Sequence, residues 1–232
     1  RLRAGVQYVL FNLLGSTLFL FALGAIYAET GTLNMADLAG RVSLVSEDAS
    51  VGIRIASVML LMVFAIKAAV VPLHFWLPSS YAEAPAPVAA LFAIMTKVGA
   101  YAIIRVYTLV FGPDVAVTEG LHGLWLLPAA LVSLAIGMVG VLAARKLDRL
   151  VAFSVIGSMG MVMVAISMFT ADSIAAALYY MVHSTLAAAA LFLISDMVRA
   201  GRLNLNLTAM PIISGAALTS ALFFAAAIAM TG

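Results

Sequence analysis

Seven apolar runs, each about long enough to cross a membrane as a helix, follow one another along this 232-residue chain. They cover residues 5–28, 55–77, 88–111, 124–144, 150–169, 174–198 and 211–230. Only 9% of the residues are charged and 65% are hydrophobic, whereas roughly a quarter of the residues of a soluble globule are charged. The ten-residue alternation of a membrane β-barrel is absent. The sequence therefore predicts an all-α polytopic membrane protein, folded as a single transmembrane domain over residues 1–232.

Two of the polar connections carry local structural signals. In the longest connection, residues 29–50, the stretch Asn34–Val42 is predicted to form a short surface helix with Asn34 as its N-cap. The connection Trp76–Pro87 contains Pro78, Pro85 and Pro87, so we predict that it is extended and stiff.

The basic residues predict an orientation, because short cytoplasmic loops carry an excess of Lys and Arg. The side of the N-terminus holds the larger set: Arg1, Arg3, Arg145, Lys146, Arg149, Arg199 and Arg202. The opposite side has Arg41, with Arg54 and Arg105 near span ends. We therefore expect the N-terminus in the cytoplasm. Because the chain starts at Arg1 and stops at Gly232 directly after an apolar run, we expect a fragment of a larger protein.

Several function classes find no support in the composition. The 12 basic and 10 acidic residues nearly balance, so there is no dense basic face for nucleic acid. Without cysteine there are no disulfides, thiolate metal sites or cysteine nucleophiles. Phosphate-binding, dinucleotide-binding, zinc-protease and serine-nucleophile motifs are also absent. We expect neither a cofactor, nor a metal site, nor an enzymatic activity of the chain's own.

Two lysines lie near the middle of predicted spans, Lys67 in the second and Lys97 in the third. A lysine at the bilayer centre costs roughly 2.5–3.5 kcal/mol on insertion scales. Such a lysine either reaches an interface with its charged end or pairs with a neighbouring helix, or it serves as a titratable site on an ion path. Burial disfavours the charged ammonium, which lets a lysine take and release a proton near neutral pH.

Lys67 is followed by Pro72 and His74. If the helix continues, His74 lies two turns beyond Lys67 on the same face. Pro72 cannot donate the helical hydrogen bond to the carbonyl of Ala68, and broken helices of this kind mark transport sites in many carriers. We therefore predict a broken helix at Pro72, although proline kinks also occur for shape alone.

Further polar residues follow in later spans. Lys97, Tyr101 and Arg105 recur every four residues and form one predicted stripe, in which Tyr101 and Arg105 are possible accessory residues. His183, in the sixth span, is either a neutral histidine hydrogen-bonded to another helix or a proton relay. No carboxylate lies near the centre of any span, and a lysine relay usually needs an acidic neighbour. That partner is expected on another subunit or on another part of the chain.

The strings Lys67–Pro78 (KAAVVPLHFWLP), Ala84–Val88 (APAPV) and Thr96–Tyr101 (TKVGAY) resemble proton-translocating antiporter subunits. These subunits are shared by Mrp-type cation/proton antiporters and the membrane arm of respiratory complex I. Within this superfamily the chain looks most like the D-type subunit of the Mrp antiporters. Relatives of the largest antiporter-like subunit of complex I place a lysine where this chain has Ala187. Ser79 and Ser80 replace an acidic residue that is more usual after the first string.

The resemblance implies a fourteen-helix inverted-repeat fold, of which these spans would be helices six to twelve. It implies a proton path through Lys67 and Lys97, with His183 and His74 as further members. The family's essential glutamate would precede Arg1, and its second-half lysine would follow Gly232.

Three hypotheses follow from the sequence. The first is a proton-translocating subunit of a multisubunit Na⁺/H⁺ or K⁺/H⁺ antiporter in a prokaryotic inner membrane, partnered by other antiporter subunits. The second is an antiporter-like subunit of complex I or of a membrane-bound hydrogenase. The third is a structural scaffold whose lysines only pair across subunits.

Overall fold

The computed structural model describes residues 2–45, 51–112, 114–209 and 215–231, apart from the side chains of residues 121–123. Over these ranges the chain is all helical, and its only extended pairing is one antiparallel bridge between Lys146 and Asn206. The predicted all-α class is confirmed. The helices are α1 (Leu2–Thr30), α2 (Met35–Ser43), α3 (Val51–Ala68), α4 (Trp76–Glu83), α5 (Ala86–Leu109), the 3₁₀ turn η2 (Ala116–Thr118), α6 (Leu121–Ala143), α7 (Leu147–Ser167), α8 (Ala171–Arg202) and α9 (Ala216–Thr231).

Six of the described helices are long and apolar enough to cross a membrane: α1, α3, α5, α6, α7 and α8. The seventh predicted run, residues 211–230, corresponds to α9, which has 16 residues. The first residues of that run, 211–214, lie outside the described ranges. The described chain therefore has six full-length candidate spans and one shorter apolar helix where seven spans were predicted.

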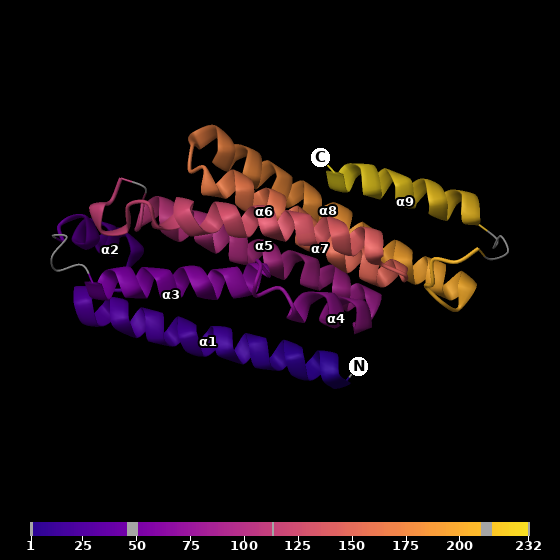
Figure 1. The fold of residues 1–232 in the computed structure, drawn as a ribbon, viewed down its shortest axis with the longest axis horizontal. Coiled ribbons are helices and arrows are strands. Elements are labelled where there is room, and N and C mark those ends of the chain that lie inside the picture. The colour runs from indigo at the N-terminus through magenta and orange to yellow at the C-terminus, as the bar shows by residue number, and fades with distance from the viewer. Residues whose placement is uncertain (1, 46–50, 113, 210–214, 232) are drawn as a thin grey trace.

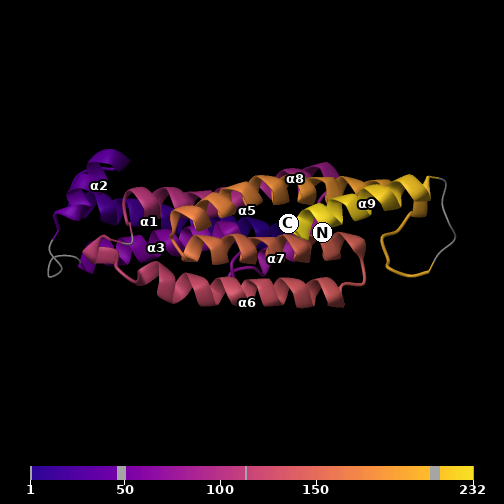
Figure 2. The ribbon, with the colours of Figure 1, turned by 90° about the horizontal axis from the view of Figure 1, so that it is seen from above.

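The helices form an elongated bundle with α1 and α9 on opposite sides (Figure 1). α1 packs on α3, α3 on α5, and α5 on α8, while α6 packs along α7 at the edge of the bundle (Figure 2). α7 is the most buried span, and α1 and α6 turn most of their surfaces outward. These outer faces carry large apolar side chains, such as Phe21 on α1 and Leu142 on α6.

The two predictions for the connections have opposite outcomes. The short surface helix is confirmed as α2, and the side-chain oxygen of Asn34 accepts the Ala36 amide at 3.0 Å. The extended connection Trp76–Pro87 is wrong, because residues 76–83 form α4. Pro78 lies in the first turn of that helix, where the amide it lacks would have no helical partner. Pro85 is the N-cap of α5, and Pro87 lies in its first turn.

Glycines allow two helix pairs to approach each other at backbone distance. On α7, a Cβ added to Gly160 would lie 2.5 Å from the Leu134 amide nitrogen of α6. On α5, a Cβ added to Gly99 would lie 2.7 Å from the Ala68 nitrogen and 2.9 Å from the Phe64 oxygen of α3. The last turn of α3 is therefore pressed directly against α5.

The close contact at Gly99 predicts that adding one methyl group there lowers the stability of the protein. We expect Gly99→Ala to destabilise the protein by about 1–3 kcal/mol, because the new Cβ meets backbone atoms that cannot rotate away. Gly24→Ala is the matched control, since a Cβ at that helical position meets nothing within 4 Å. The measurement is the thermal unfolding of the full-length protein in detergent. Equal melting temperatures for the two variants would contradict a tight contact between α3 and α5.

Candidate functional site

The centre of the candidate site is a break in the second apolar run. α3 ends at Ala68, and residues 69–75 are non-helical before α4 begins at Trp76. Ala69 has a φ of 53°, in the left-handed region that commonly ends helices. The predicted broken helix at Pro72 is confirmed. The prediction that His74 shares a helical face with Lys67 is wrong, because the helix has already ended before His74.

Side chains from outside the break bond to one backbone group inside it and to one in the last turn of α3. The Val71 amide donates a 2.9 Å hydrogen bond to the Ser133 hydroxyl of α6, and Ser133 is fully buried. The Trp76 indole donates to the Ile66 carbonyl at 3.1 Å. At membrane depth a non-helical backbone is tolerated only where protein or a water-filled cavity satisfies its polar groups. Ser133 and Trp76 therefore hold the break in place.

Lys67 lies in the last turn of α3, directly before the break. Its ammonium donates to the side-chain oxygen of Asn12 on α1 at 2.5 Å. Its side chain crosses Gly15, where an added Cβ would lie 3.9 Å from the lysine Cε. Lys67 lines a groove of about 500 Å³ between α1, α3 and α5, whose other walls are mostly apolar.

Lys97 is 4% exposed and lies on α5. Its ammonium donates to the Ser158 hydroxyl of α7 at 3.0 Å, and that hydroxyl donates in turn to the Val155 carbonyl. A second groove, of about 480 Å³ between α5 and α8, brings Lys97 together with Tyr101. Arg105 is exposed and does not line this groove, so the structure joins only two members of the predicted stripe.

The two lysines point to different neighbours. Lys67 bonds to α1 and Lys97 to α7, on either side of the contact between α3 and α5 at Gly99. Val98 lines both lysine grooves and lies between them. Within the described part of the chain neither lysine forms an ion pair, and each ammonium bonds to a neutral oxygen.

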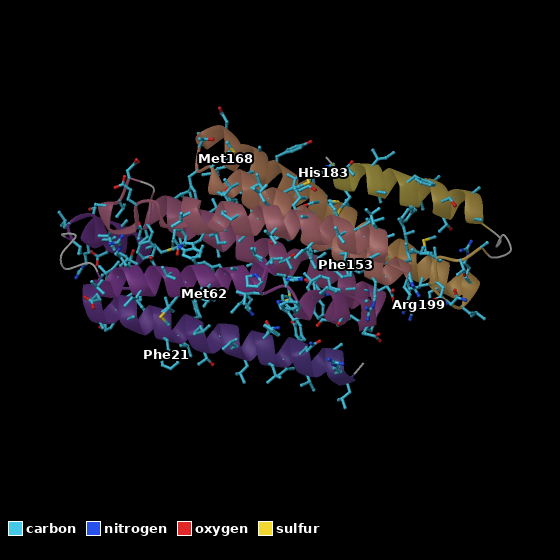
Figure 3. All side chains as sticks on the ribbon, viewed as in Figure 1. Phe21, Met62, Phe153, Met168, His183 and Arg199 are labelled. Atoms are coloured by element: carbon cyan, nitrogen blue, oxygen red, sulfur yellow. The ribbon has the colours of Figure 1, made fainter. Side chains whose placement is uncertain are left out.

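The two histidines lie apart from this pair. The His183 ring contacts the Ala229 carbonyl of α9, so this histidine sits between α8 and α9 (Figure 3). It also stacks on Tyr179, with ring centroids 6.2 Å apart. His74 is buried in the break beside the Phe75 ring, at 4.4 Å between centroids. Among the described residues, no group of three or more His, Asp or Glu side chains could hold a metal ion.

The whole chain matches one protein family. Its residues 1–232 fit the family described as NADH:quinone oxidoreductase/Mrp antiporter, TM. The chain belongs to this family. The resemblance carried by the strings around Lys67 and Lys97 is confirmed.

Two curated members of the family are named as D-type antiporter subunits. The probable K⁺/H⁺ antiporter protein of this type from Rhizobium meliloti (strain 1021) is 41% identical over 202 residues, which are 87% of this chain and 38% of the relative. The Na⁺/H⁺ antiporter protein of this type from Bacillus subtilis (strain 168) is 41% identical over 197 residues, which are 84% of this chain and 38% of the relative. The chain thus spans little more than a third of the curated relatives that it matches.

Solved structures of related complexes have the same fold. The Mrp complex from Dietzia sp. DQ12-45-1b contains a chain with a TM-score of 0.89 and 28% identity, over 100% of this chain and 42% of that one. Respiratory complex I from Thermus thermophilus gives a TM-score of 0.86 and 27% identity, over 100% of this chain and 49% of that one.

Three partners of the site residues were not identified from the sequence: Asn12, Ser133 and Ser158. Each is a small polar residue inside a long apolar run, and such residues commonly bond to their own helix. Ser154 illustrates this, since its hydroxyl donates to the Val151 carbonyl three residues earlier. Only the tertiary structure distinguishes a serine that reaches another helix from one that does not.

The hydrogen bond between the Val71 amide and the Ser133 hydroxyl allows a test of how much this hydroxyl stabilises the break. Ser133→Ala leaves the Val71 amide without its acceptor, and an unsatisfied buried amide costs about 1–3 kcal/mol. Ser154→Ala is the matched control, because it removes only a bond within α7. We expect the thermal unfolding temperature of the full-length protein to fall more for Ser133→Ala than for the control. An equal fall would show that the Val71–Ser133 bond does not stabilise the break.

Proposed function

We propose that this chain belongs to a proton-translocating subunit of a multisubunit monovalent cation/proton antiporter. The two D-type relatives, named for K⁺/H⁺ and Na⁺/H⁺ exchange, support this assignment at 41% identity. On this proposal the protein lies in a prokaryotic inner membrane, with Arg3 and the basic ends of α7 and α8 in the cytoplasm. Its partners are the other subunits of a hetero-oligomeric complex, and it relays protons without catalysing a chemical reaction.

One observation carries the proposal: two lysines at membrane depth are held by neutral hydrogen-bond partners. Within the described chain neither ammonium has a carboxylate partner, and the acidic neighbour that a lysine relay needs is expected on another subunit or on another part of the protein. Asn12 and Ser158 orient the ammonium groups of Lys67 and Lys97 without locking in their charge. Each amine can therefore accept or release a proton as its surroundings change.

The proposed mechanism assigns a role to each residue. Lys67, beside the helix break, receives a proton from the groove between α1, α3 and α5. Lys97 passes it onward through the groove that it shares with Tyr101. His183 and His74 are proposed as further relay positions, reached through water, and Arg105 as an accessory charge. Each charge that crosses the full membrane is coupled to the membrane potential by roughly 2.3 kcal/mol per 100 mV.

A second function is favoured by the structural comparisons. An archaeal membrane-bound sulfane sulfur reductase contains a chain with a TM-score of 0.84 and 26% identity, covering 97% of this chain and 46% of that one. Together with complex I, it places the same fold in respiratory complexes. The alternative is a proton-pumping subunit driven by a redox reaction in neighbouring subunits. Flavin or iron–sulfur subunits that co-purify with the full-length protein would favour this alternative.

The antiporter proposal predicts that the two lysines are essential for exchange. In everted vesicles that contain the native complex, Na⁺ or K⁺ added after respiration should collapse the pH gradient reported by a dye. We expect at least a roughly tenfold slower collapse for Lys67→Ala and for Lys97→Ala, because each removes a proton carrier. Lys146→Ala, at an exposed position, is the matched control and should keep the wild-type rate.

Assembly must be measured in the same vesicles. If Lys67→Ala lowers the amount of assembled complex and leaves exchange per complex unchanged, then the lysine is structural and the scaffold hypothesis holds. If wild-type vesicles respond to neither cation, the redox-driven alternative replaces antiport.

A further inference from the structure

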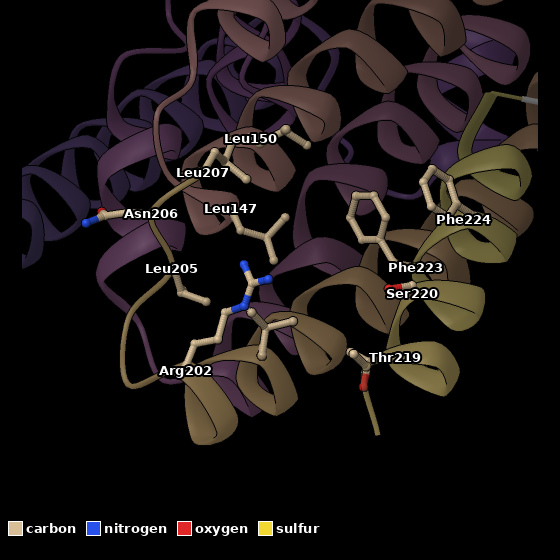
Figure 4. Close-up of a pocket in the computed structure, with 12 residues that line it drawn as sticks. Leu147, Leu150, Arg202, Leu205, Asn206, Leu207, Thr219, Ser220, Phe223 and Phe224 are labelled. Carbon is tan, nitrogen blue, oxygen red and sulfur yellow. The ribbon is translucent and has the colours of Figure 1, made fainter. Parts of the chain in front are cut away.

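A groove of about 350 Å³ lies at the end of the bundle opposite η2, away from both lysines. It is formed by the start of α7, the end of α8, the following segment and α9 (Figure 4). Its walls are mostly apolar and include Leu147, Leu150 and Phe223. Polar groups are few: the hydroxyls of Thr219 and Ser220, the amide of Asn206 and the guanidinium of Arg202.

Backbone pairing builds one wall of this groove. The Leu147 amide donates to the Leu205 carbonyl at 2.9 Å, and the Leu207 amide donates to the Arg145 carbonyl at 3.0 Å. The segment after α8 is thereby fixed across the start of α7. Leu205, buried by this pairing, closes the groove beside Arg202. The groove is therefore a built feature of the fold.

Arg202 is the distinctive residue of the groove. Its side chain extends into the groove, with the guanidinium directed toward Leu147 (Figure 4). Within the described ranges it has no carboxylate partner, whereas Arg199, one turn earlier, pairs with Asp148 at 3.6 Å. A half-buried guanidinium that has no carboxylate partner is well placed to form charge-assisted hydrogen bonds with an anion.

The surroundings favour a negatively charged occupant at the membrane surface. Arg145 and Lys146 are exposed on the outer side of the same backbone pairing. The acidic residues of this end are Glu83, Asp148 and Asp196, of which Asp148 is already paired with Arg199. Basic pockets between membrane helices on the side where Lys and Arg collect are suited to anionic lipid headgroups.

We propose that this groove binds one anionic phospholipid. The Arg202 guanidinium holds the phosphate, the Ser220 hydroxyl faces the glycerol region, and an acyl chain lies along Leu150 and Phe223. A phospholipid matches both the guanidinium and the apolar wall of the groove, since it carries a phosphate and an acyl chain in one molecule. A free anion would leave the apolar wall uncovered, and a zwitterionic lipid such as phosphatidylcholine would bring a choline cation to this basic end of the bundle together with its phosphate.

The test uses the full-length protein in its complex, purified in mild detergent and incubated with phosphatidylglycerol or phosphatidylcholine. Native mass spectrometry measures which lipid stays bound, and thermal unfolding measures the stabilisation. We expect wild type to retain phosphatidylglycerol and to melt at a higher temperature with it than with phosphatidylcholine. Arg202→Gln should lose both effects. Arg3→Gln is the matched control and should keep them, because Arg3 is exposed and does not line the groove.

A second variant guards against a folding defect in Arg202→Gln. Ser220→Trp places a large side chain at an exposed position of α9, where it fills the groove and leaves Arg202 in place. It should also lose the retained phosphatidylglycerol. Unchanged retention in both variants would overturn the proposal, as would equal retention of the two lipids by wild type. If inorganic phosphate alone reproduces the stabilisation, the groove is a small-anion site and the lipid assignment is wrong.

Discussion

The need to satisfy backbone polar groups at membrane depth governs the architecture around the candidate site. A helix satisfies its own amides and carbonyls, so a break in a spanning helix must be supplied with partners from elsewhere. Here the Ser133 hydroxyl and the Trp76 indole supply them, from α6 and from α4. Because α6 packs along α7, the break is tied to the most buried span of the bundle. These two hydrogen bonds fix where α3 ends, and Lys67 lies in its last turn.

The site also depends on which helices the lysines can reach. α3 and α5 touch at backbone distance, so there is no room between them for a lysine side chain. Lys67 and Lys97 therefore leave this contact in different directions and find Asn12 and Ser158 on flanking helices. The grooves beside them open toward the outer surface of the described chain. In a longer protein or a complex, such openings are the places where further helices would meet the two amines.

Much of the fold was predictable from the sequence, because a membrane allows few structures. Apolar runs predict the long helices, and Asn34 predicts the start of α2. α4 was not predicted, because Pro78 reads as a helix breaker unless its position within the first turn is known. The position of His74 was wrong for a related reason, since the helix ends at Ala68, before Pro72 is reached. The serine and asparagine partners of the site could not be predicted, because an apolar run gives no information about distances between helices.

The glycine contact between α3 and α5 limits how the site can move. If α3 slid past α5 by one helical turn, about 5.4 Å, its backbone at Phe64 and Ala68 would meet residues of α5 that carry a Cβ in place of Gly99. Neighbouring residues of α5 such as Ala100 and Ile103 are already fully buried. A second packing arrangement of α3 on α5, shifted by one turn, would therefore clash. In the proposed relay, access to the two lysines would therefore change through rotation of side chains and through wetting of the grooves rather than through a slide of α3 along α5. The helices themselves act as a fixed frame, which makes the proposed relay a device of small local movements.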